Sequence, residues 1–303
     1  MHWAWLSLIS ALFLGLYDVC QKHALRDNPV LPVLLISTAT GATVWGALLA
    51  LQGVAPDLCP DLLRVPPLGV TAHAQLLLKS AIVAASWMCT YLAVKHLPIS
   101  LAAPIRSTSP LWTLAAALLL LGERPSWLQL LGVLTTLLSF FGLSLVGRLE
   151  GVHFHRNRWV AWMILGTLLA ATSGLYDKLL LGRLKLPPAT VQAWFSIYLL
   201  LLFAPLSLWW WRSRARDGGS EPARFEFRFS MPLLALCLLC ADFVYFWALS
   251  DPAGLVSLVA SIRRGATLIA FAAGILLFKE QNALKKLGPV LGIVSGIALT
   301  LLG

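Results

Sequence analysis

Two copies of one short motif divide the chain almost in half. Gly-Leu-Tyr-Asp occurs at residues 15–18 and again at residues 174–177, which is 159 positions later in a chain of 303 residues. Two further pairs keep nearly the same spacing, at a shift of 157: Arg106 with Arg263, and Glu123 with Glu280. Near-constant spacing of this kind indicates a duplicated unit. Each copy contains five long apolar segments, and an odd number of membrane crossings places the second copy upside down relative to the first.

The composition indicates a membrane protein. Hydrophobic residues make up 59% of the chain and charged residues only 12%, with a mean hydropathy of +0.81, which is too apolar for a soluble protein of this length. A helix needs about 20 residues to cross the hydrocarbon layer, and open strands leave backbone groups unsatisfied in lipid. We therefore predict an all-α polytopic membrane protein with ten transmembrane helices in two inverted five-helix repeats, over residues 1–148 and 159–303.

Ten apolar segments fit this length requirement. Leu, Ala and Val occur all round most of them, as expected for helices surrounded by lipid or by other helices. The predicted helices are Trp3–Gln21, Val30–Gln52, Ala74–Val94, Ser100–Leu121, Trp127–Val146, Trp159–Leu181, Ala189–Trp211, Met231–Leu249, Pro252–Phe278 and Ala283–Leu302.

Positive charge is concentrated in alternate loops. The odd-numbered loops carry most of the Lys and Arg residues, including five Arg residues in the long segment 212–228. Because Lys and Arg mark the cytoplasmic side, we expect the odd loops in the cytoplasm and both termini outside. Segment 212–228 is polar and contains Gly, so we interpret it as a flexible connector. The predicted location is a multi-pass position in a bacterial inner membrane.

Each half contains an apolar stretch that ends in Glu, over residues 103–123 in the first copy and residues 261–280 in the second. Together with the repeat and the ten apolar segments, these stretches resemble the EamA-like permeases, the ten-helix branch of the drug/metabolite transporter (DMT) superfamily. The resemblance covers nearly the whole chain. It implies a transporter and leaves the substrate open, because a shared fold does not identify a ligand.

The resemblance implies a secondary-active permease, with export as the expected direction, that moves a small metabolite by alternating access. Arginines within the apolar segments favour a zwitterionic or anionic substrate such as an amino acid. Two alternatives come from relatives, namely a flippase for a polyprenyl- or lipid-linked headgroup and a sugar-phosphate-type exchanger. A non-transporting membrane scaffold is the third. The expected partners are a small-molecule substrate, the lipid bilayer, protons if transport is coupled, and a second copy if the protein is a homodimer. Nucleic acid is not expected.

Sequence signatures of catalysis and of cofactor binding are missing. The chain has no phosphate-cradling Gly-rich loop with its Lys and no Gly-x-Ser-x-Gly turn. His153 and His155 lie one residue apart in a loop and do not form a recognised metal-ligand pattern, and the five scattered cysteines form no disulfide framework. We therefore predict a protein that is not an enzyme and that uses no metal and no cofactor.

Three arginines occupy predicted helices. Arg106 lies between two prolines that remove backbone hydrogen bonds, and Arg263 has the corresponding place in the second copy, followed by Arg264 and Gly265. Paired interruptions in the two halves point to a central binding site, where a guanidinium can fork onto a carboxylate or phosphate. We assign Arg106 and Arg263 to substrate binding and Arg264 to a charge network. The alternative is that each Arg neutralises a buried acid or caps broken backbone.

The repeated motif gives each copy one acid and one aromatic hydroxyl. Lys22 follows Asp18 by one helical turn, so an ion pair within the helix is possible. In the second copy the neighbouring cation is Lys178, which points about 100° away from Asp177 around the helix. The alternatives are interfacial ion pairs for the acids and interfacial anchoring for the tyrosines. We assign Lys22 to the charge network and the following residues to substrate binding: Tyr17, Asp18, Tyr176 and Asp177.

Asp242 lies in the middle of the eighth predicted helix, with no cation within one turn of its own helix. A carboxyl group at this depth that switches its protonation state provides what proton coupling requires. The alternative is a permanent ion pair with Arg263 or Arg264. The approximate counterpart of Asp242 in the first copy is Trp87. We assign Asp242 to coupling or to the charge network, and Trp87 and Tyr245 to the substrate pocket.

Structural roles are expected for three other charged residues. Lys79 lies near the start of a predicted helix, from which its long side chain can reach the membrane surface. Glu123 and Glu280 lie at helix ends beside Arg124 and Lys279. We therefore expect Glu123 and Glu280 to form ion pairs at the surface.

Overall fold

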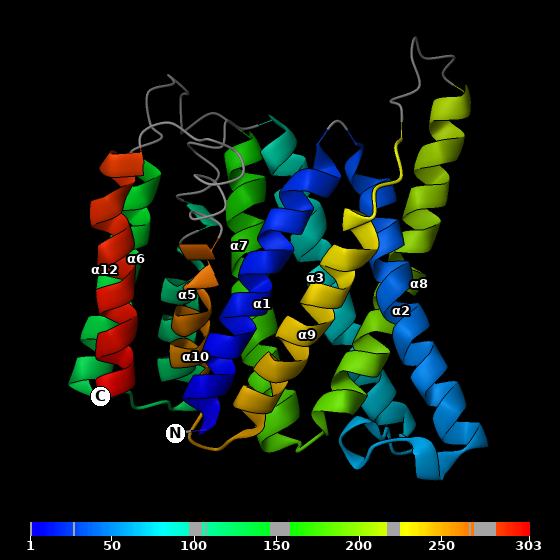
Figure 1. The fold of residues 1–303 in the computed structure, drawn as a ribbon, viewed down its shortest axis with the longest axis horizontal. Coiled ribbons are helices and arrows are strands. Elements are labelled where there is room, and N and C mark those ends of the chain that lie inside the picture. Colours follow the sequence, from blue (N-terminus) through cyan, green and yellow to red (C-terminus); the bar gives the residue numbers. More distant parts are fainter. Residues whose placement is uncertain are drawn as a thin grey trace.

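The computed structural model describes residues 2–26, 28–96, 105–106, 108–145, 158–216, 225–266, 268–269 and 283–303. Within these residues the protein is all-helical, with ten α-helices and no strands. They are α1 (His2–Leu25), α2 (Val30–Val54), α3 (Val70–His96), α5 (Ser109–Ala116), α6 (Trp127–Leu145), α7 (Arg158–Lys178), α8 (Pro188–Arg216), α9 (Ser230–Ser250), α10 (Val256–Arg263) and α12 (Ala283–Leu302). Figure 1 shows them as a bundle with both termini at the same end.

Five helices of the described residues are long and apolar enough to cross a membrane: His2–Leu25, Val30–Val54, Arg158–Arg183, Pro188–Arg212 and Ser230–Ser250. Three shorter apolar helices lie at Ser109–Leu121, Trp127–Ser139 and Leu287–Leu302. A multi-pass membrane protein follows from these helices. The arrangement of ten crossings in two inverted repeats stays a prediction.

Two predicted long helices are interrupted in the structure. The predicted helix Pro252–Phe278 is represented by α10, which ends at Arg263, and Arg264 and Gly265 form a turn. The predicted helix Ser100–Leu121 is represented by α5 and a π-helical turn over Ala117–Leu121, with a turn at Thr108 before α5 begins. The breaks fall beside Arg263 and Arg106, where the prolines and Gly265 predicted them.

Helices of the two sequence halves pack against each other in pairs. The main contacts join α1 with α9, α3 with α7, α2 with α8, and α6 with α12, and α6 and α12 run side by side at one edge of the bundle in Figure 1. Glycines permit the close approach: a Cβ atom at Gly132 of α6 would lie 2.6 Å from the carbonyl oxygen of Gly296 on α12. Small residues at helix contacts are typical of membrane proteins.

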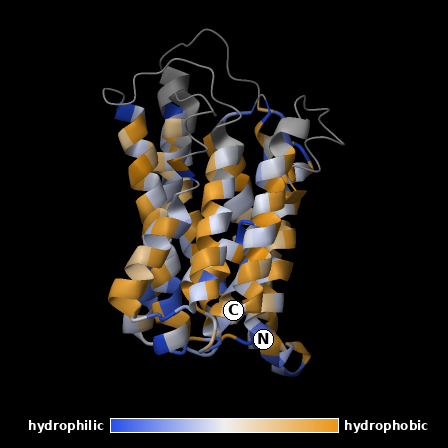
Figure 2. Ribbon diagram, turned by 90° about the vertical axis from the view of Figure 1, so that its left-hand side faces the viewer, coloured by the Kyte–Doolittle hydropathy of each residue, from blue (hydrophilic) through white to orange (hydrophobic). Residues whose placement is uncertain are grey.

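Polar groups inside the bundle are largely satisfied by the helices themselves. The hydroxyl of Ser7 donates to the Trp3 carbonyl, and the hydroxyl of Thr167 donates to the Met163 carbonyl, one turn earlier in each helix. Figure 2 shows hydrophobic residues along the lengths of the helices and hydrophilic ones mainly near their ends. Charged side chains in the interior are therefore exceptions that need a partner or a function.

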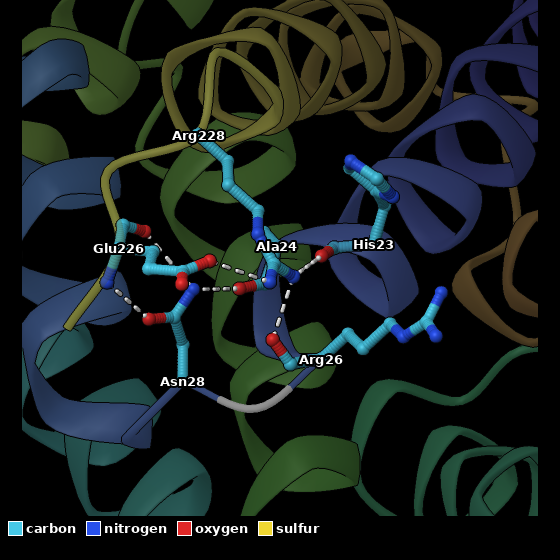
Figure 3. A network of polar contacts seen from close by, with 6 residues as sticks. All are labelled: His23, Ala24, Arg26, Asn28, Glu226 and Arg228. Carbon is cyan, nitrogen blue, oxygen red and sulfur yellow. Dashed lines mark hydrogen bonds and ion pairs between the residues drawn. The ribbon is translucent and has the colours of Figure 1, made fainter. Parts of the chain in front are cut away.

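A polar network fixes the chain that precedes α9 to the end of α1 (Figure 3). Arg228 donates hydrogen bonds to the carbonyl oxygens of His23 and Arg26, at 2.9 and 2.6 Å. Asn28 donates to the Glu226 carbonyl at 3.1 Å and accepts from the Glu226 amide at 2.9 Å. The last residues of the predicted connector 212–228 are therefore held against α1, and Arg228 caps carbonyls that the end of the helix leaves unpaired.

Candidate functional site

Lys79 and Asp177 form a buried ion pair between the two sequence halves. The Nζ atom of Lys79, on α3, donates to Oδ1 of Asp177, on α7, and only 2% and 5% of the two side chains are exposed. Lys79 is the tenth residue of α3, about 14 Å along the helix axis from its first residue. The predicted reach of Lys79 to the membrane surface is therefore wrong, because the ammonium group has a carboxylate partner inside the bundle.

Aromatic rings complete the surroundings of the Lys79 ammonium group. Its Nζ atom lies 4.3 Å from the ring centre of Phe195 and 4.9 Å from that of Phe246. Ring faces attract cations, and the attraction grows where water is excluded. Lys79 is thus held by one carboxylate and two rings, which offsets part of the cost of burying its charge.

Lys178, the neighbouring cation that the sequence placed about 100° away from Asp177 around the helix, has other partners. Its Nζ atom donates instead to the carbonyl oxygens of Leu249, Asp251 and Gly254, at 3.1, 2.9 and 2.7 Å. These carbonyls belong to the end of α9 and to the link between α9 and α10. A cation is favoured at this position because the C-terminal end of a helix carries partial negative charge.

Arg263 and Asp242 form a second ion pair, closer to open space. Nη2 of Arg263, on α10, donates to Oδ1 of Asp242, on α9, at 2.8 Å, and 15% and 18% of the two side chains are exposed. The Arg263 guanidinium also lies over the ring of Tyr245, 4.1 Å from its centre. The pairing of Asp242 with Arg263, which the sequence left as the alternative to proton coupling, is thus present in this conformation.

Tyr245 touches both ion pairs. Its ring packs against Arg263, and its hydroxyl is within electrostatic range of the Asp177 carboxylate. The same hydroxyl lies 3.5 Å from the place where a Cβ atom would stand at Gly174, which is an ordinary contact distance. Through Tyr245 the two ion pairs form one polar cluster that spans α3, α7, α9 and α10.

The first copy of the repeated motif faces different charges. Asp18 is partly exposed, and its carboxylate is within electrostatic range of Arg106, Arg264 and Arg263. Arg106 is exposed and Arg264 is half-buried. The three predicted arginines therefore act on one carboxylate of the first half, and Arg263 belongs to both groups of charges.

The remaining residues of the motif have separate environments. The Tyr17 hydroxyl accepts a hydrogen bond from Gln21 at 3.0 Å. Tyr176 is half-buried and packs against the largest apolar cluster of the bundle. The side chain of Lys22 lies outside the described residues, as does all of Glu280.

Glu123 has a structural position that its sequence context did not predict. It is buried, and its carboxylate accepts hydrogen bonds from the backbone amides of Val256 and Ser257, at 2.6 and 3.3 Å, and from the Ser257 hydroxyl at 2.6 Å. These amides are the unpaired donors at the start of α10, where an anion is favoured. The predicted surface ion pair of Glu123 is wrong, and Glu123 instead joins the first half to α10.

A cavity lies beside Asp242, between α2, α3, α8 and α9. In this conformation the cavity is small, with room for a few water molecules at most. The lining residues are Ser37, Thr38, Gly41, Trp87, Gln192, Phe195, Ser196, Leu199, Ala235, Leu238, Leu239 and Asp242. A second, smaller cavity shares Ser37 and Trp87 with the first and reaches Tyr17 and Gln21. Tyr17, Trp87 and Asp242 are thus brought to the walls of adjoining cavities.

Sequence reasoning missed Lys79, Glu123 and Gln192 as interior polar residues. The signal for Lys79 was its position inside a predicted span, where a charge points to a functional or paired role. Gln192 gave a weaker signal, since an uncharged amide costs less to bury. No group of three potential metal ligands occurs among the described residues.

Comparison with known proteins agrees with the sequence resemblance. The model of the EamA-like transporter family matches residues 1–145, almost half of the chain. A solved structure titled only "Crystal structure of protein" superposes with a TM-score of 0.72 over 99% of this chain and 96% of its own, at 16% identity, which shows a shared fold. None of the curated proteins matches the chain. The apolar helices thus make the chain a multi-pass membrane protein, and its first half is similar to a family of small-molecule transporters.

Proposed function

We propose that the protein is a secondary-active permease that carries a small zwitterionic metabolite, such as an amino acid, by alternating access across a bacterial inner membrane. The observation that carries the proposal is the cavity beside the partly exposed Asp242–Arg263 pair, in the interior of an apolar helical bundle. Ionisable side chains are expensive inside a membrane, and those that border a cavity mark a substrate or ion pathway.

Charge balance favours a zwitterion over an anion. Asp242 neutralises Arg263, and Asp177 neutralises Lys79, so the cluster around Tyr245 carries no formal net charge. A substrate with both an ammonium and a carboxylate group can replace each partner of an ion pair without leaving a charge unpaired. The guanidinium groups of Arg106 and Arg264, near Asp18, can receive the carboxylate end.

Two inverted repeats of five helices, over residues 1–148 and 159–303, supply the rocking units in this proposal. The pairing of helices supports it: if α1 corresponds to α7, and α3 to α9, then the α1–α9 and α3–α7 contacts are equivalent, and α2–α8 and α6–α12 pair corresponding helices. The family match over residues 1–145 covers almost the whole first unit. Transporters with inverted repeats bind substrate where the two units meet.

Asp242 is the residue that we propose for proton coupling. It faces the cavity and its partner Arg263 is itself partly exposed, so substrate and protons can reach the pair. Protonation of the carboxyl group would release the guanidinium, which would then be free to bind a substrate carboxylate.

Uptake into liposomes tests this function. Purified protein would be reconstituted and offered a pool of radiolabelled or mass-resolved metabolites, with and without an imposed pH gradient, beside protein-free liposomes. We expect accumulation of zwitterions that follows the gradient in the native protein and is lost in Asp242→Asn. Gradient-independent exchange would contradict proton coupling, and the absence of flux for every solute would contradict transport.

A further inference from the structure

Gln192, a residue that lines the cavity, carries a buried hydrogen-bond acceptor without a donor. Gln192, on α8, is 1% exposed and lines the cavity. Its Nε2 atom donates to the carbonyl oxygen of Leu239, on α9, at 2.6 Å. Because a backbone carbonyl only accepts, this contact fixes which end of the amide is nitrogen. The other end, Oε1, has no partner among the described residues, and a buried acceptor in this state costs free energy until a donor reaches it.

Asp242 and Thr38 also offer acceptors to the cavity, whereas the hydroxyls of Ser37 and Ser196 and the indole N–H of Trp87 can donate. Asp242 contributes a carboxylate, with Oδ1 bonded to Arg263. The hydroxyl hydrogen of Thr38 is directed to the Leu34 carbonyl at 2.9 Å, so only the oxygen lone pairs of Thr38 can face a ligand. Ser196 lies close to α2, with its Oγ 3.8 Å from the Cβ position of Gly41. Lys, Arg and His are missing from the described residues that line the cavity.

The rest of the lining is apolar and aromatic. Trp87 packs against Phe203, with ring centres 6.0 Å apart and planes 19° apart, which holds its ring in place. Phe195 and three leucines line the same cavity: Leu199, Leu238 and Leu239. A ligand that fits both parts of the wall has hydrogen-bond donors at one end and an apolar body at the other.

We propose that this cavity binds the protonated amine end of the substrate, between Gln192 Oε1 and the Asp242 carboxylate, with the apolar body against Trp87 and Phe195. A carboxylate at this place would meet two acceptors, so the cavity rejects anions that lack an amine. The inference rests on the proposed transport function and specifies which end of a zwitterion enters this cavity.

Two ligands of nearly equal shape can show whether the cavity recognises an amine or a carboxylate. Binding of radiolabelled phenethylamine to the purified protein in lipid nanodiscs would be measured with unlabelled phenethylamine and hydrocinnamate as competitors. Both ligands carry a phenyl ring on a short chain, and only the charged end differs. We expect hydrocinnamate to compete at least about tenfold more weakly, because its carboxylate would meet the acceptors of Gln192 and Asp242.

Matched serine variants on one helix locate the site. Ser196 and Ser207 are both buried on α8, and only Ser196 lines the cavity. We expect Ser196→Ala to weaken phenethylamine binding by about threefold and Ser207→Ala to leave it unchanged, whereas Gln192→Leu weakens it by about tenfold. Thermal unfolding in the same nanodiscs verifies the fold of each variant. If Gln192→Leu does not fold, the comparison of Ser196→Ala with Ser207→Ala still tests whether the amine binds in this cavity.

The binding results test the amine site, and the flux results test transport. Equal competition by the two ligands, no binding of phenethylamine, or equal effects of Ser196→Ala and Ser207→Ala would overturn the amine site. Flux of metabolites in liposomes reports on transport separately: flux together with unselective binding would overturn only this inference. Selective binding without flux of any solute would support the amine site and contradict the proposed function.

Discussion

Two interior ion pairs among the described residues differ in their access to open space, and this difference distinguishes a structural contact from a candidate transport site. Lys79–Asp177 is almost completely buried and is surrounded by rings, whereas Arg263–Asp242 is partly exposed and Asp242 lines the cavity. A buried pair that is fully enclosed cannot exchange partners with a substrate, so it serves to join α3 to α7. A pair beside a cavity can exchange partners, and this is what a transport cycle needs.

The largest expected effect comes from removing one partner of the enclosed pair. Lys79→Ala leaves the Asp177 carboxylate without its cation inside the bundle, and we expect a loss of about 3–5 kcal/mol in the free energy of unfolding. Unfolding would be followed by titration with dodecyl sulfate in mixed micelles.

The matched control replaces both partners at once. Lys79→Met combined with Asp177→Leu leaves no buried charge and fills similar volume, so most of the lost stability should return. A double variant as unstable as Lys79→Ala would mean that the pair does more than neutralise charge. This result would contradict the interpretation that the pair only joins α3 to α7.

The next largest effect on stability is expected from substitution of the motif glycines, Gly15 on α1 and Gly174 on α7. A Cβ atom at Gly15 would lie 2.6 Å from Cβ of Ile269, whereas at Gly174 the nearest atom is the Tyr245 hydroxyl at 3.5 Å. We expect Gly15→Ala to lower the free energy of unfolding by about 1–3 kcal/mol through overpacking. Gly174→Ala should be neutral or stabilising by up to about 1 kcal/mol, through helix propensity. The same titration measures both, and equal effects would contradict the two separate environments.

The smallest effect on stability is expected at Tyr245, which touches both pairs. Tyr245→Phe removes the hydroxyl beside Asp177 and keeps the ring against Arg263. We expect a loss of about 0.5–1.5 kcal/mol in the free energy of unfolding, because a polar group beside a buried carboxylate is removed. In a thermodynamic cycle the loss should disappear when the Lys79→Met and Asp177→Leu changes are already present. If it persists there, the hydroxyl does not act through the enclosed pair.

Much of the fold could be predicted from the sequence, because apolar length and helix-breaking residues are local signals. The predicted starts at Val30 and Trp127 are those of α2 and α6, and the break after Arg263 follows from Gly265. The partners of the charges are not local. Lys79 and Asp177 are 98 residues apart in the chain, and Glu123 caps a helix that starts 133 residues later. Such contacts depend on how the helices pack, so the sequence did not identify Lys79 as the cation of Asp177.

Zwitterion uptake into liposomes would be measured for two folded variants, one for each ion pair. The comparison tests whether transport depends on Asp242–Arg263 and not on Lys79–Asp177. Asp242→Asn should reduce uptake by at least about tenfold, because the group that exchanges partners is lost. The double variant Lys79→Met with Asp177→Leu should keep uptake within about threefold of the native protein, because the enclosed pair is structural. Normal uptake by Asp242→Asn together with loss of uptake in the double variant would contradict the account and place transport at the enclosed pair.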